Sequence, residues 1–179
     1  MRTFHIRILV LALFVAASNN VVAAAVPHLH CFERASNYYR IDVKLLVAIA
    51  KIESNFDMAA TNMNRNGTQD FGIMMINSHW KPKLEALGID WGEVTTSRCL
   101  NIHVGAWVLA QNFAQVGVNW YAVGAYNAGF GMSDRSRKNR LRYALKVHDS
   151  LTEIEEFFPH GNGGNIAGFS HPPLLTASN

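Results

Sequence analysis

The chain lacks several features that would point to common classes of function. No segment alternates convincingly at the period of a strand, and no glycine-rich phosphate loop follows a strand. The eight histidines are scattered, without a pair four residues apart on one helix, so we expect no metal site. We expect no cofactor either. Beyond the N-terminus, no apolar run could cross a membrane.

The N-terminus has the pattern of a secretory signal peptide. A basic start with Arg2 and Arg7 leads into the apolar stretch Ile8–Ala17, and the small residues Ala23–Ala25 follow as a candidate cleavage site. The apolar stretch is too short for an ordinary membrane span. We therefore predict that residues 1–25 are an export signal, with an uncleaved N-terminal anchor as the alternative.

The chain has little net charge once this segment is set aside. The full sequence carries 16 Lys+Arg and 13 Asp+Glu, and removing residues 1–25 takes away two basic residues and no acidic one. General nucleic-acid binding needs many cations to neutralise phosphates. The nearly neutral remainder argues against it.

The sequence after residue 25 predicts one all-α domain over residues 26–151, followed by a flexible tail over residues 152–179. The tail contains glycines and paired prolines but few core-forming residues. The polar segment Ala59–Gly72 favours turns. The predicted helices are Cys31–Tyr39, Asp42–Ser54, Lys81–Leu87, Asn101–Val116, Trp120–Tyr126 and Asp134–Asp149.

The two cysteines, Cys31 and Cys99, both lie in the part that would be exported, where oxidation is permitted. A disulfide between them would stabilise the domain by about 4 kcal/mol in the loop-entropy model. Two buried free thiols are the alternative.

Glu53 stands where the apolar pattern of its helix calls for a hydrophobic side chain. At 100° per residue, Leu46 lies about 20° from Glu53 around the helix axis, whereas Lys44 lies about 180° away. A carboxyl group against apolar neighbours has a raised pKa, as a general acid requires. The alternative is a structural glutamate whose tip reaches solvent or pairs with an interior arginine.

Three motifs favour the interpretation of Glu53 as a general acid over that of a structural glutamate. ESNF at Glu53, FGIMMIN at Phe71–Asn77 and AYNAG at Ala125–Gly129 occur in the order and approximate spacing of the SLT-type lytic transglycosylases, lysozyme-like enzymes that cut peptidoglycan. The resemblance extends from about Cys31 to Leu151. CF near the start, LLVAIAKIES on the helix of Glu53 and RCLNIHVGAWVLA later most resemble the small periplasmic members associated with type III and type IV secretion or conjugation. That subgroup typically pairs cysteines at positions like Cys31 and Cys99.

The resemblance implies a lysozyme-like fold, a periplasmic location, peptidoglycan strands as substrate, and possible contact with secretion or conjugation machinery. Glu53 would protonate the glycosidic oxygen between N-acetylmuramic acid and N-acetylglucosamine, then accept a proton from the C6 hydroxyl to form a 1,6-anhydromuramyl end. We expect a monomer. The alternatives are a hydrolytic muramidase and a catalytically weakened glycan-binding scaffold, ahead of an inhibitor or adhesin.

The same resemblance assigns the substrate-binding candidates Asp70, Met75, Asn77, Tyr126 and Asn127. Tyr126 would orient the catalytic carboxyl group through its hydroxyl, and Asn127 would support the cleft or the sugar. Of the two aspartates near Glu53, Asp57 and Asp70, Asp70 is the better candidate for substrate contact, although either could be a loop cap. Met75 departs from the family, which usually has glutamine there, and so puts amide contacts from that position in doubt.

A crowded basic segment lies at Asp134–Lys146, where Arg135, Arg137, Lys138, Arg140 and Arg142 gather. A solvated helix face accounts for it most simply. The alternative is attraction to anionic groups of the cell wall or to an acidic partner.

Overall fold

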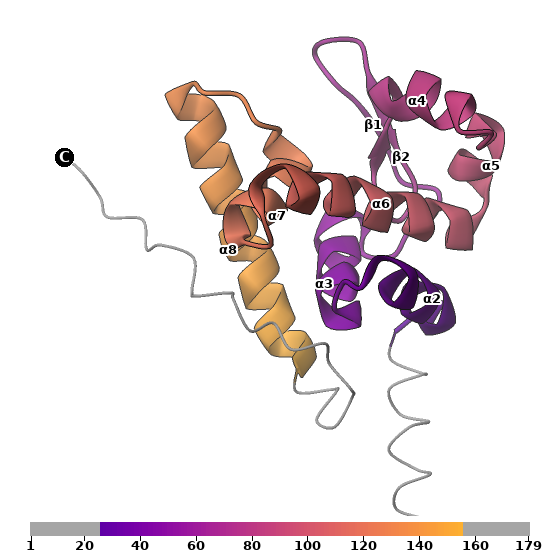
Figure 1. The fold of residues 1–179 in the computed structure, drawn as a ribbon, viewed down its shortest axis with the longest axis horizontal. Coiled ribbons are helices and arrows are strands. Elements are labelled where there is room, and N and C mark those ends of the chain that lie inside the picture. The colour runs from indigo at the N-terminus through magenta and orange to yellow at the C-terminus, as the bar shows by residue number, and fades with distance from the viewer. Residues whose placement is uncertain (1–25, 156–179) are drawn as a thin grey trace, which may run out of the picture.

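The computed structural model describes residues 26–155, and the predicted export signal and most of the predicted tail lie outside this range. Seven α-helices and three short strands make up the described part (Figure 1). Within residues 26–155, no helix combines the length and the apolar character needed to cross a membrane. The elements are α2 (Leu29–Tyr39), α3 (Val43–Ser54), β1 (Thr61–Met63), β2 (Gln69–Phe71), β3 (Ile76–Asn77), the 3-10 turn η1 (Ser78–Trp80), α4 (Lys81–Ala86), α5 (Trp91–Thr96), α6 (Arg98–Val116), α7 (Trp120–Ala128) and α8 (Asp134–Glu155).

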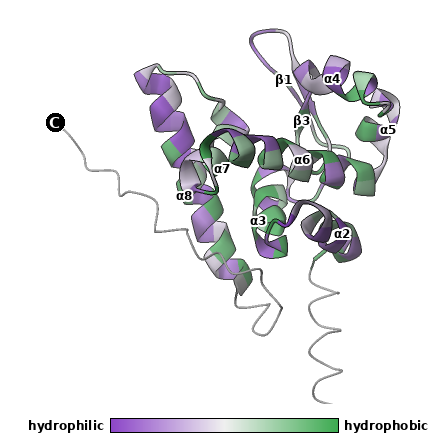
Figure 2. Ribbon diagram, viewed as in Figure 1, coloured by the Kyte–Doolittle hydropathy of each residue, from purple (hydrophilic) through white to green (hydrophobic). Residues whose placement is uncertain are grey.

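Helix α3 forms the centre of the core. The Asp42 carboxylate caps its first turn by accepting from the Lys44 backbone N–H at 2.7 Å, and Asn55 ends it with a left-handed φ of 53°. All six residues from Leu45 to Ala50 are buried, which the uninterrupted apolar run LLVAIA explains. Figure 2 shows this helix largely in the hydrophobic colour.

Helices α7 and α8 pack closely against each other, and α8 also packs along α3. A Cβ atom added at Gly124 in α7 would come within 2.5 Å of the backbone carbonyl oxygen of Arg140, so glycine permits this approach. Arg140 itself is buried and donates to the carbonyl oxygens of Gly129 and Gly131, each at 2.8 Å. Arg140 is therefore not part of the solvated basic face that the sequence suggested.

The polar segment Ala59–Gly72 contains most of a small antiparallel sheet, which the sequence analysis did not predict. Strand β2 pairs with β1 and with β3, so that Asp70 stands opposite Asn62 on one side and Asn77 on the other. The strands have two or three residues each, and all three residues of β1 are exposed. Such short strands give almost no alternating pattern to detect.

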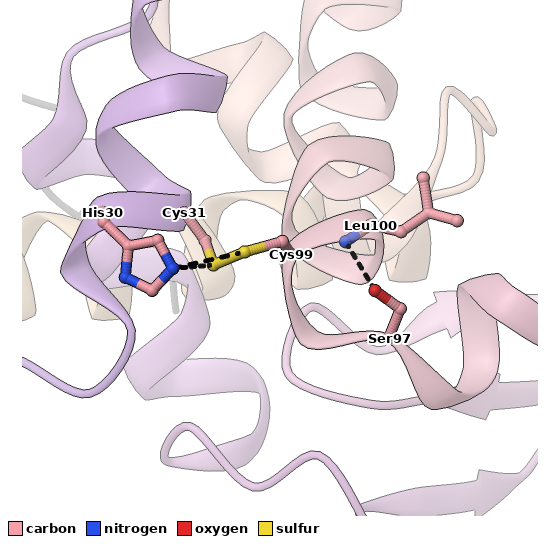
Figure 3. Close-up of a disulfide and its surroundings, with 5 residues drawn as sticks. All are labelled: His30, Cys31, Ser97, Cys99 and Leu100. Carbon is pink, nitrogen blue, oxygen red and sulfur yellow. Dashed lines mark hydrogen bonds between the residues drawn. A yellow bond between two sulfur atoms is a disulfide. The ribbon is translucent and has the colours of Figure 1, made fainter.

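A disulfide joins Cys31 in α2 to Cys99 in the first turn of α6, with their Cα atoms 4.9 Å apart (Figure 3). The Nε2 atom of His30 lies 3.3 Å from the Cys31 sulfur. These three residues are a group of potential metal ligands that comes together within residues 26–155, and the disulfide already joins its two sulfurs.

Helix boundaries agree with the prediction to within a few residues, with two additions. Helix α5 was not predicted, and α8 continues to Glu155 instead of ending at Asp149. The predicted boundary between domain and tail, after Leu151, therefore falls inside α8.

Candidate active site

A cleft of about 1270 Å³ contains Glu53 in its wall. The β-sheet and the turn that joins β1 to β2 line one side, and α6 and α7 line another. All five predicted substrate-binding residues line this cleft. They are Asp70, Met75, Asn77, Tyr126 and Asn127.

Glu53 lies in the last turn of α3, partly buried, and its carboxyl group accepts a hydrogen bond from the Tyr143 hydroxyl at 2.5 Å. Burial raises the pKa of Glu53 from the usual 4.5 to about 7, and the negative charge of Asp70 acts in the same direction. The hydrogen bond from Tyr143 opposes this rise because it favours the charged carboxylate. At neutral pH, Glu53 can therefore both donate and accept a proton.

The predicted hydrogen bond from the Tyr126 hydroxyl to Glu53 is not formed. The Tyr126 hydroxyl donates to the backbone carbonyl oxygen of Met74 at 2.9 Å, while the Tyr126 ring stacks on that of Tyr143 at 6.5 Å between centroids. Tyr143, from the middle of α8, makes the contact expected of Tyr126. Burial and the Glu53 charge raise the pKa of Tyr143 well above its usual value, so its hydroxyl remains a donor.

Asp70 is held by three asparagine side chains. Asn62 and Asn64 donate to one carboxylate oxygen at 3.0 and 2.8 Å, and Asn77 donates to the other at 2.6 Å. These amide donors fix the orientation of a carboxylate that lines the same cleft as Glu53. Asp57, in contrast, is exposed and accepts from the Ala59 backbone N–H at 2.8 Å, which makes it a turn cap.

The segment between β2 and β3 is anchored by Asn101, a fully buried residue of α6. Its side-chain oxygen accepts from the Met74 backbone N–H at 2.8 Å, and its amide donates to the carbonyl oxygens of Phe71 and Val94 at 3.0 and 3.1 Å. Gly72 has a φ of 75°, and a Cβ atom there would come within 2.5 Å of the Asn101 amide nitrogen.

Met75 occupies the position at which the family usually has glutamine, and it has a positive φ of 45°. It is partly buried and lines the cleft. Its thioether offers the cleft an apolar, polarisable surface in place of an amide.

Part of the cleft lining combines an aromatic side chain, Trp80, with a basic one, Lys83. Trp80 lies edge-on to Trp107 at 5.2 Å, and the Lys83 ammonium group lies 5.6 and 5.1 Å from the two ring centroids. Trp80 and Lys83 line the cleft. Trp120 is buried, as the sequence suggested.

Replacing Tyr143 with phenylalanine tests the hydrogen bond to Glu53. Loss of this bond removes a contact that favours the carboxylate, so the pKa of Glu53 should rise by about one unit. A general acid loses activity as pH rises through its pKa, so the alkaline limb of the pH–rate profile should shift to higher pH. The maximal rate should fall about tenfold.

Tyr126→Phe is the matched control, because it removes a neighbouring hydroxyl that contacts Met74 and leaves the Glu53 hydrogen bond intact. Its alkaline limb should stay in place. Equal displacement in both variants would contradict the assignment to Tyr143.

The chain matches a protein family and several known proteins. Residues 30–147 match the family described as Transglycosylase SLT domain. Protein IpgF of Shigella flexneri is 37% identical over 137 residues, which cover 75% of this chain and 89% of that protein. An X polypeptide of Escherichia coli is 41% identical over 70% of this chain and 74% of its own length. Invasion protein IagB of Salmonella typhi is 36% identical over 70% of this chain and 78% of its own length.

The fold comparison confirms the expected lysozyme-like SLT architecture. The structure of an inactive mutant of lytic transglycosylase Slt from Pseudomonas aeruginosa matches with a TM-score of 0.60 and 19% identity, over 78% of this chain and 25% of that one. At 19% identity, the match shows a shared fold and nothing about function. The family match and the relatives show that the chain belongs to the transglycosylase SLT domain family and is a lytic transglycosylase.

Proposed function

We propose that this enzyme cleaves the β-1,4 bond between N-acetylmuramic acid and N-acetylglucosamine in peptidoglycan and leaves 1,6-anhydromuramyl ends. The observation that carries the proposal is the Glu53 carboxyl group, which lies partly buried in the wall of the cleft, is held by Tyr143 and has a pKa raised to about 7. Such a group holds a proton at neutral pH and can take one back.

In the first step, protonated Glu53 would give its proton to the glycosidic oxygen as the bond to the muramyl C1 breaks. The acetamido group of the substrate would assist at C1. In the second step, the Glu53 carboxylate would accept the proton of the muramyl C6 hydroxyl while that oxygen bonds to C1. The two transfers return Glu53 to its starting state and consume no water.

The Tyr143 hydroxyl would act between these steps. It donates to Glu53 at 2.5 Å, and this contact stabilises the carboxylate that exists after the first proton transfer. Tyr143 is in this account a positioning residue that acts through Glu53.

Asp70 favours a second candidate function, hydrolysis by a muramidase. Glycosidases that use water commonly rely on a second carboxylate, and Asp70 lines the same cleft with its orientation fixed by three amides. Mass spectrometry of muropeptides released from sacculi separates the two functions. We expect ends that are lighter than reducing ends by the mass of one water, and reducing ends alone would show hydrolysis.

We propose further that residues 1–25 direct export to the periplasm, where a monomeric enzyme would open the wall locally for a secretion or conjugation apparatus. The support is the N-terminal pattern together with a relative named as an invasion protein. A mature N-terminus near Ala25 in protein isolated from the periplasm would agree with export. An intact N-terminus on protein that stays in the cytoplasm would contradict it.

A further inference from the structure

A second, smaller cavity of about 330 Å³ adjoins the catalytic glutamate. It shares Glu53 and Asn127 with the long cleft. Helices α3 and α8 supply the rest of its lining, from Ile52, Asn139, Arg142, Tyr143 and Lys146. The two cavities therefore meet at the side chain that would act on the glycosidic bond.

Two cations one helical turn apart, Arg142 and Lys146, line this second cavity, and both are exposed. Within the described side chains, residues 26–154, neither forms an ion pair. Arg142 makes only a long contact of 3.5 Å with the side-chain oxygen of Asn139. On the same two helices, Lys51 is paired with Glu153 at 2.6 Å and Arg137 with Asp134 at 3.3 Å.

Glu53 does not form an ion pair with Arg142 or Lys146. Its carboxyl group is bound by the Tyr143 hydroxyl, and the neighbours that influence its charge are Tyr143 and Asp70. Asp70 lines the long cleft and not the second cavity. The lining of the second cavity therefore contains two positive charges, Arg142 and Lys146, and its one acidic side chain is Glu53.

We propose that this cavity is a subsite for the carboxylates of the stem peptide carried by the muramic acid at the cleavage point, bound by Arg142 and Lys146. The inference rests on the proposed function. A glycan strand in the long cleft would place a muramyl residue at Glu53, and the peptide branches from the strand at that sugar. The second cavity shares Glu53 with the cleft and offers the charge that complements carboxylates.

The test compares two double variants on two substrates. Arg142→Gln/Lys146→Gln removes the cations of the cavity. Arg135→Gln/Lys138→Gln removes the same charge from exposed positions of the same helix outside either cavity. The substrates are native sacculi and sacculi whose carboxylates have been converted to neutral methylamides with carbodiimide and methylamine.

On native sacculi, the cavity variant should need about three- to tenfold more substrate for half-maximal release, with its maximal rate within about twofold of wild type. The control variant should match wild type. On methylamidated sacculi the difference between wild type and the cavity variant should vanish. It should also shrink on native sacculi as salt is added, because these charges are exposed.

Two results would overturn the subsite while the enzyme remains a peptidoglycan lyase. One is equal behaviour of the two double variants on native sacculi. The other is an undiminished defect of the cavity variant on methylamidated sacculi. A wild-type enzyme that releases no muropeptides from native sacculi would overturn the proposed function itself, and the subsite with it.

Discussion

Replacing Glu53 with glutamine is expected to lower the rate of muropeptide release from sacculi by about a thousandfold. Glutamine has nearly the same shape but neither protonates a glycosidic oxygen nor accepts a proton from the C6 hydroxyl. The cleft, the Tyr143 side chain and the Asp70 network would remain. Chromatography of the released muropeptides over time measures the effect.

Asp57→Asn is the matched control, since it removes a carboxylate from an exposed turn outside the cleft. Its rate should stay within about twofold of wild type. A Glu53→Gln variant that digests sacculi as fast as Asp57→Asn would support the scaffold alternative and exclude Glu53 as the acid.

The Glu53→Gln variant should also be at least as stable as wild type above pH 7. The folded-state pKa of Glu53 is about 7 against an ordinary 4.5, so the folded state binds more protons than the unfolded state between these values. The free energy of unfolding of wild type therefore falls as pH rises through this window, and glutamine escapes that loss. A loss of activity without a loss of stability separates chemistry from folding.

Replacing Asn101 with alanine is expected to lower the free energy of unfolding by about 3–5 kcal/mol. The change leaves the Met74 N–H and the carbonyl oxygens of Phe71 and Val94 without the partner that Asn101 provides in the interior. Buried backbone groups without partners carry their full desolvation cost. Urea unfolding of the disulfide-bonded protein measures the change.

Asn112→Ala provides the comparison on the same helix. Asn112 is also buried, but its amide makes one hydrogen bond, to the Ala122 carbonyl oxygen at 3.2 Å. We expect a loss of about 1 kcal/mol there. If both variants lost the same free energy, the anchoring role of Asn101 would be wrong.

The sequence predicted two separate things about Glu53, its place among apolar residues from helical periodicity and its role as the acid from the resemblance of the three motifs. Helical periodicity alone places this carboxyl group on the apolar side of α3, and burial then raises its pKa. The long helices were predicted for the same reason. Their apolar periodicity extends over several turns, whereas α5 has six residues and β3 has two.

Tyr143 was not predicted because its role depends on a contact 90 residues apart in the chain. In the sequence it is one aromatic residue on the buried face of a long amphipathic helix, a position that core packing explains equally well. Tyr126 carried the motif and therefore received the role that Tyr143 has in the structure. A motif identifies which segments meet, but the packing of α7 on α8 decides which hydroxyl reaches Glu53.

The asparagines around Asp70 show a second limit. Asn62, Asn64 and Asn77 are typical turn-formers in the sequence, and the pairing of three short strands is what directs them to one carboxylate. The register of such strands cannot be read from two or three residues. The structure was therefore needed to show that the Asp70 carboxylate lines the same cleft as Glu53.

The most direct test of the central claim is a titration of the Glu53 side chain by NMR, followed through its carboxyl carbon in the intact protein. We predict an apparent pKa of about 7 for Glu53, because burial outweighs the hydrogen bond from Tyr143. A value near the ordinary 4.5 would mean that Glu53 carries no proton at neutral pH, and the proposed acid–base mechanism would be wrong.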